Sequence, residues 1–153
     1  MAAAAETIAL IERYYRTFNA GDSEAMLACL ADDVAHDVNQ GARRTGKEAF
    51  RAFSAHMERC YAEQLKNIAV MATADGARAA AEFEVLGTYI ETDEGLPPAS
   101  GQTYHLPAGA FFEVENGLIK RVTTYYNLAA WLRQIAPPAA PAAGEEPPAK
   151  EVS

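Results

Sequence analysis

Two residues in the first quarter of the chain have side chains that could together move a proton. Tyr14 carries a hydroxyl that can donate a hydrogen bond to a carbonyl oxygen, and Asp37 carries a carboxylate that can accept a proton from a neighbouring carbon. Apolar spacing predicts an amphipathic helix over residues 6–20, which contains Tyr14, and a short strand over 34–39, which contains Asp37. The order of these elements predicts that hydroxyl and carboxylate face one cavity.

Both residues also have a purely structural interpretation. Asp37 could cap the adjoining loop or pair with Arg43 or Arg44, because aspartates beside loops commonly serve turns. Tyr14 could be a core tyrosine whose hydroxyl bonds to a backbone carbonyl. The residues by themselves leave both alternatives open.

A third candidate lies in the second half of the chain. His105 and Gly109 belong to one predicted strand and share a face, because an even number of positions separates them. His105 could donate to a bound carbonyl or relay a proton, or it could be a satisfied core histidine. Gly109 indicates close backbone approach or room for a ligand.

Aromatic and small side chains from several elements could form the walls of an apolar pocket. The same spacing would suit any hydrophobic core. The residues predicted to line the pocket are Phe18, Phe53, Met57, Tyr61, Tyr89, Gly109, Phe111, Tyr125 and Asn127.

Other chemistries find little support in the sequence. Phosphate-binding loops, dinucleotide-binding motifs and nucleophile elbows are absent from the sequence, and its three histidines are not at metal-ligand spacing. We therefore expect no metal and no cofactor. Cys29 and Cys60 lie in apolar helical registers and are expected to be buried free thiols.

Composition predicts a single soluble domain. Half of the 153 residues are hydrophobic, and the net charge of -8 argues against nucleic acid and anionic membranes as partners. Residues 1–5 lack the features of a signal peptide and no apolar run is long enough to span a membrane, so a cytoplasmic location is expected.

The predicted elements indicate an α+β fold. Helices are expected at 6–20, after the N-cap Asp22, and from a capping box at 45–48 to about residue 61. Strands at 65–73, 78–91, 102–115 and 118–127 follow, with hairpin turns at 75–76 and 116–117. The domain is expected to span 1–136, and the Pro/Ala/Glu-rich segment 137–153 is predicted to be a disordered tail.

Several of these motifs carry a family resemblance: Tyr14 after Glu-Arg, the Asn-Ala-Gly-Asp turn, Ala-Asp-Asp33 and Asp37. In order and spacing they resemble ketosteroid isomerases and the SnoaL-like polyketide cyclase-like proteins of the nuclear-transport-factor-2-like (NTF2-like) superfamily, over roughly residues 6–135. The resemblance implies a cone-shaped, cystatin-like fold with three N-terminal helices on a curved, mostly antiparallel sheet. It also implies that Tyr14 is the oxyanion-hole tyrosine and Asp37 the general base.

One position departs from the isomerases. Gly109 stands where they carry a protonated aspartate as second oxyanion donor, and losing one such donor typically costs about 2.7–4 kcal/mol of transition-state stabilisation. Either His105 compensates for the missing donor, or the substrate and reaction differ.

Three functions remain as hypotheses. In the first, a cofactor-independent enzyme isomerises or cyclises a small hydrophobic carbonyl compound: Asp37 abstracts a proton, Tyr14 stabilises the enolate and His105 assists. In the second, the pocket binds a hydrophobic ligand without turnover. In the third, the chain is a dimeric interaction module with a vestigial pocket. A homodimer is expected through the sheet face that carries Phe112, Val114, Val122 and Tyr126.

Overall fold

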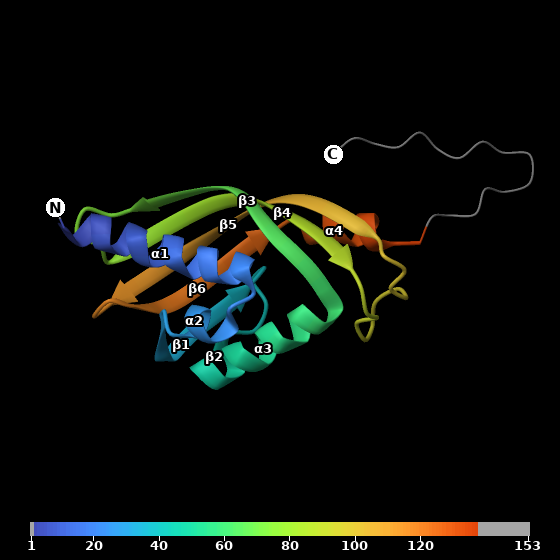
Figure 1. Cartoon of the computed structure of the whole chain (residues 1–153), viewed down its shortest axis with the longest axis horizontal. Coiled ribbons are helices and arrows are strands. Elements are labelled where there is room, and N and C mark those ends of the chain that lie inside the picture. Colours follow the sequence, from blue (N-terminus) through green and yellow to red (C-terminus); the bar gives the residue numbers. More distant parts are fainter. Residues whose placement is uncertain (1, 138–153) are drawn as a thin grey trace, which may run out of the picture.

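The computed structural model describes residues 2–137 and shows helices packed on one side of a curved sheet (Figure 1). The mixed α+β prediction is confirmed. The helices are α1 (Ala2–Ala20), α2 (Ser23–Leu27), α3 (Lys47–Cys60) and α4 (Leu128–Ile135). The strands are β1 (Leu30–Val38), β2 (Arg44–Thr45), β3 (Tyr61–Ala72), β4 (Arg78–Tyr89), β5 (Thr103–Glu115) and β6 (Leu118–Tyr126).

The six strands form one sheet in the order β2-β1-β6-β5-β4-β3. All neighbouring pairs are antiparallel except β1 and β6, which run parallel. A parallel pair needs a long connection between its strands, and α3 with strands β3–β5 supplies it here. The sheet curves around α1, α2 and α3, and its concave face therefore forms one wall of the interior (Figure 1).

Local sequence explains most element boundaries. α1 is followed by Gly21 at a φ of 72°, and the Asp22 carboxylate caps α2 by accepting a hydrogen bond from Ala25 N at 3.2 Å. Asn116 and Gly117 both have positive φ, as the predicted tight hairpin between β5 and β6 requires.

Four expectations about the elements need correction. The predicted capping box is wrong, because Thr45 belongs to β2 and the N-cap of α3 is Gly46, which has no side chain. β3 begins at Tyr61, directly after α3 and four residues earlier than predicted. β2 and α4 were not predicted at all. The predicted tail lies outside the described residues except for Pro137.

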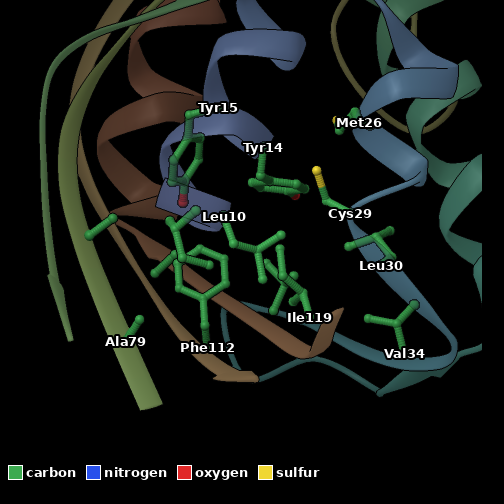
Figure 2. Close-up of a cluster of buried hydrophobic side chains, with 14 of the residues drawn as sticks. Leu10, Tyr14, Tyr15, Met26, Cys29, Leu30, Val34, Ala79, Phe112 and Ile119 are labelled. Carbon is green, nitrogen blue, oxygen red and sulfur yellow. The ribbon is translucent and has the colours of Figure 1, made fainter. Parts of the chain in front are cut away.

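The core consists of two clusters of buried side chains. The larger lies between α1 and the sheet and includes Leu10, Tyr14, Leu30 and Phe112 (Figure 2). The smaller gathers around Trp131 of α4. Both predicted thiols, Cys29 and Cys60, are free and buried. Among residues 2–137, no helix is long and apolar enough to cross a membrane.

Candidate functional site

A cavity of about 710 Å³ lies between the helices and the concave face of the sheet. Its lining is mainly aromatic and aliphatic, and this volume would hold a small organic molecule. Five of the predicted pocket and catalytic residues line it: Tyr14, Phe18, Phe53, Met57 and Tyr61.

Three carboxylates line the cavity, those of Glu58, Glu63 and Asp93. Glu63 belongs to a row of three residues that crosses the sheet and sets its position. Glu63 of β3 lies opposite Gly87 of β4, and Gly87 lies opposite Tyr104 of β5. The Tyr104 ring passes over Gly87, where a Cβ would overlap it, and its hydroxyl donates a hydrogen bond to Glu63 Oε2. The glycine is therefore what allows the phenol to reach the carboxylate.

Burial is the main influence on the ionisation of Glu63. It raises the pKa of the Glu63 carboxyl, and the hydrogen bond from Tyr104 only partly opposes this effect. The charge of Glu63 in turn adds to burial in raising the pKa of Tyr126, which also lines the cavity. A carboxyl with a raised pKa in a cavity is a typical proton-transfer group.

Tyr14 forms part of the inner wall of the cavity. Its ring packs edge-on against Tyr15, Phe50 and Phe112, and only 6% of the residue is exposed. Figure 2 shows the phenol extending from α1 toward Cys29. Burial raises the pKa of Tyr14 well above its usual value, so the hydroxyl is neutral and able to donate a hydrogen bond.

Asp37 does not reach the cavity, contrary to prediction. Its carboxylate accepts hydrogen bonds from Arg43 Nε at 2.8 Å, Arg43 Nη2 at 2.9 Å and Thr123 Oγ1 at 2.7 Å. The Arg43 guanidinium is the largest influence holding its pKa at about 2. Strand alternation explains the error, because His36 and Val38 point inward and Asp37 between them points to the opposite face. The pairing with Arg43 therefore agrees with the structural interpretation of Asp37.

His105 and three of the predicted pocket residues lie on the outer face of the sheet. His105 is exposed, and its Nε2 lies 2.6 Å from Glu84 Oε1. Phe111 and Tyr125 are 48% and 40% exposed, and Gly109 lies opposite Tyr125 in the strand register. The inward residues of β5 are instead the even-numbered ones, from Tyr104 to Phe112, so the two faces were assigned in reverse.

The remaining two predicted pocket residues have structural contacts. Asn127 caps α4, and its Oδ1 accepts a hydrogen bond from Ala130 N at 2.9 Å. Tyr89 is fully buried beside the cavity, and its hydroxyl donates to Pro97 O at 2.7 Å and accepts from Asp93 N at 2.8 Å. Tyr89 therefore anchors the loop between β4 and β5.

The mouth of the cavity carries polar residues that sequence reasoning missed. His36 is 5% exposed, and its ring packs on Phe50 and Phe53 at centroid distances of 4.5 and 4.7 Å. Burial, with help from Arg44, lowers the pKa of His36 to about 4, so the imidazole is neutral at pH 7. The alternation of Val34, His36 and Val38 with Asp33, Ala35, Asp37 and Asn39 was the signal that could have revealed its inward orientation.

The sequence matches the SnoaL-like domain family over residues 11–122. This chain belongs to that family. A crystal structure of a candidate polyketide cyclase from Xanthomonas campestris pv. campestris is 52% identical, with a TM-score of 0.86, and the match covers 88% of this chain and 99% of that one. A second candidate polyketide cyclase, from Pseudomonas putida KT2440, is 58% identical over 85% of this chain and 98% of that one, with a TM-score of 0.84.

More distant solved structures share the fold of this SnoaL-like chain. An NTF2-like protein from Burkholderia pseudomallei K96243 has a TM-score of 0.73 at 18% identity, with 86% of this chain and 98% of that one covered. An LEH-like epoxide hydrolase from M. tuberculosis has a TM-score of 0.70 at 17% identity, with 86% of both chains covered. At such identities the similarity concerns the fold alone. No curated protein is significantly similar.

A second polar cluster of this SnoaL-like domain lies at the cavity rim. The ligand atoms of His56, Cys60 and Asp93 lie within 4.8 Å of one another, a grouping that the i, i+4 spacing of the first two could have revealed. His56 Nε2 lies 2.8 Å from Asp93 Oδ1, and Arg59 Nη2 lies 3.0 Å from His56 Nδ1. Because a guanidinium adjoins the imidazole, we interpret the cluster as a hydrogen-bonded network that holds the β4–β5 loop against α3.

Proposed function

We propose that this protein is a cofactor-independent enzyme that moves a proton next to the carbonyl group of a small hydrophobic compound. The family and the fold support a cofactor-free role of the cyclase or isomerase type. The observation that carries the finer proposal is the Glu63 carboxyl, which lines an apolar cavity and has a raised pKa.

Glu63 takes the role that the sequence assigned to Asp37. Its Oε2 accepts a hydrogen bond from the Tyr104 hydroxyl, which fixes the carboxylate, while Oε1 makes no hydrogen bond to another described residue and remains free to take a proton. In the ionised form, the raised pKa makes Glu63 a stronger proton acceptor than a solvated glutamate. The neutral hydroxyl of Tyr14, which lines the same cavity, supplies a hydrogen bond to the carbonyl oxygen.

The proposed reaction begins when Glu63 takes a proton from the carbon next to the carbonyl. The electron pair of the broken C–H bond forms the C=C bond of an enolate, and the carbonyl oxygen accepts the negative charge beside Tyr14. In a β,γ-unsaturated substrate the enolate is conjugated with the second C=C bond, and return of the proton from Glu63 to the γ-carbon moves the double bond and completes an isomerisation. Attack of the enolate carbon on a second carbonyl of the same molecule forms a C–C bond and moves the π electrons of that carbonyl onto its oxygen. That oxygen takes the proton back from Glu63, which completes a cyclisation.

Exchange of carbon-bound protons in D₂O tests the first step without knowledge of the product. We expect the wild type to accelerate exchange next to the carbonyl of small apolar ketones and β-keto esters, measured by ¹H NMR. Glu63→Gln should lower that rate by about 10²–10⁴-fold, the usual contribution of a general base. Glu84→Gln is the matched control, because Glu84 lies on the outer face with His105 as its partner.

Full exchange activity in Glu63→Gln would refute the assignment of the base. Ligands that bind the cavity without any exchange in the wild type would instead favour the second hypothesis, a protein that binds hydrophobic compounds. The large apolar cavity supports that alternative equally well.

A further inference from the structure

The cavity mouth holds three groups that share one property: each has side-chain nitrogen atoms that make no hydrogen bond to a described residue. The Asn39 side-chain nitrogen is buried without a partner, and the buried His36 Nδ1 is likewise unpartnered among residues 2–137. Arg44 has no carboxylate within salt-bridge distance in the same range, whereas its neighbour Arg43 is bound to Asp37. All three residues line the cavity.

The backbone brings His36 and Arg44 onto one face. They lie directly opposite each other in the register of β1 and β2, so their side chains emerge together. Both pack on Phe53: the Arg44 guanidinium carbon lies 4.7 Å from the ring centroid, and the His36 ring lies against the same phenyl group. The aromatic side chain thus holds the cation at the mouth without neutralising it.

Asn39 is held in place by the neighbouring strand. Its Oδ1 accepts a hydrogen bond from Tyr126 N at 2.8 Å, and its own backbone N donates to Thr124 O at 2.9 Å. Because the carbonyl end of the amide is fixed, the NH₂ end is fixed as well and stays without a partner. A buried unpaired donor is unfavourable in a native protein unless a ligand or water satisfies it.

Building on the proposed function, we propose that the substrate is an apolar carbonyl compound that carries a carboxylate, and that Arg44, Asn39 and His36 bind this carboxylate at the cavity mouth. A planar guanidinium and an amide NH₂ together match the two oxygens of a carboxylate. The one carboxylate adjacent in sequence, Asp37, is turned to the other face and bound there by Arg43. The net charge of -8 disfavours ligands with several negative charges, so a single carboxylate fits best.

Binding of matched probes tests this assignment. The probes are 3-cyclohexylpropanoate, two longer cyclohexyl-alkanoates and the methyl ester of each acid. Binding is measured by isothermal calorimetry and by the fluorescence of Trp131, the single tryptophan, which lines the cavity. We expect the wild type to bind each carboxylate about tenfold or more tightly than its ester, as a charge-assisted contact should. Arg44→Met should abolish this preference, because it should weaken binding of the acid far more than binding of the ester.

Two further variants sharpen the test. Asn39→Asp keeps the oxygen that accepts from Tyr126 N but replaces the donor with a negative charge, so it should weaken carboxylate binding more than ester binding. Arg13→Met, on the exposed side of α1, is the control and should bind like the wild type. Equal affinity for acid and ester in the wild type, or no carboxylate binding in the millimolar range, would overturn the proposal.

The proposed carboxylate site and the proposed reaction can be tested separately. A Glu63→Gln variant should retain the carboxylate preference, because Glu63 is not one of the three donors. If carbon-bound protons do not exchange but the acid still binds more tightly than the ester, the proposed function is wrong and the carboxylate site stands.

Discussion

Glu63 and Asp37 are two carboxylates on opposite faces of one sheet, and their pKa values move in opposite directions. Burial raises that of Glu63, whereas Arg43 and Thr123 lower that of Asp37 to about 2. A raised pKa in a cavity is what the proposed proton transfer requires of Glu63, while a lowered pKa in a saturated hydrogen-bond network is typical of a group that stabilises the fold. Residue type and chain position alone could not distinguish these roles.

Asp37→Asn should destabilise the protein at neutral pH. The folded state favours the charged form of Asp37, because its environment lowers the pKa of the carboxyl. The contribution of Asp37 to folding stability is therefore complete above its ordinary pKa of 3.8 and is lost as the pH falls through about 2. Because Arg43 is 54% exposed and screened by solvent, we expect a loss of only about 1–2 kcal/mol, measured by urea unfolding at pH 7.

Glu63→Gln should have the opposite effect on stability when its urea unfolding is measured at pH 7. The folded state favours the protonated form of Glu63, so stability falls as the pH rises from 4.5 through the raised folded value. The amide should therefore raise stability at pH 7 and flatten this part of the pH profile. If both variants lost stability equally at pH 7, the distinction drawn between the two carboxylates would be wrong.

At the scale of elements, turns and hydrophobic periods are local, and the sequence predicts them well. Asp22 caps α2, and Asn116-Gly117 turns the chain between β5 and β6 as expected. It is harder to predict from the sequence which side chains of a strand point to the inner face of the sheet. A shift of one residue moves every side chain to the other face, and β1 and β5 were both assigned the wrong inward positions.

Glu63 was missed for a related reason. The predicted strand began at residue 65, four positions after the true start of β3 at Tyr61. The carboxylate matters because of Gly87 and Tyr104, which are distant in sequence, and only the register of three strands brings them together. The alternation of Tyr61, Glu63 and Leu65 would have indicated its inward direction had the strand been started correctly.

Gly87→Ala should disrupt the element that positions Glu63. The added methyl group would overlap the Tyr104 ring, so the ring must move and release the carboxylate. We expect a loss of about 1–3 kcal/mol in unfolding free energy, the usual cost of overpacking, together with reduced proton exchange. Tyr104→Phe separates the two effects, because it removes the hydroxyl and keeps most of the packing.

Gly109→Ala is the matched control for that substitution. Gly109 lies on the adjacent strand, and its nearest obstacle is Ala81 O at 3.3 Å, so a small shift should accommodate the methyl group. A Gly87→Ala protein with wild-type stability and wild-type proton exchange would show that Gly87 and Tyr104 do not determine the position of the Glu63 carboxylate.

At the scale of the whole molecule, the sheet separates two surfaces with different uses. Its concave face forms the cavity, while its convex face exposes an apolar row in which Met71 lies opposite Ala80 and Ala80 lies opposite Phe111. Met71 and Phe111 are 52% and 48% exposed, and the ring of Tyr125 lies 5.9 Å from that of Phe111. The face on which the dimer was expected carries Phe112 and Val122, which are buried in the core and cannot contact a second copy.

We predict that two copies of the chain associate through this convex face. A two-fold axis would bring the apolar row of one copy against that of the other and bury side chains that water now contacts, while both cavities stay open. Light scattering after size-exclusion chromatography should give a dimer for the wild type. Phe111→Glu should give a monomer, because it places a charge in the centre of the contact.

Leu132→Glu on α4 is the control, since it alters another exposed apolar residue away from the convex face. A monomeric Phe111→Glu protein that still binds the carboxylate probes would show that the cavity is complete within one copy. A wild type that stays monomeric at all accessible concentrations would contradict the predicted interface. The exposed row would then need another partner or none.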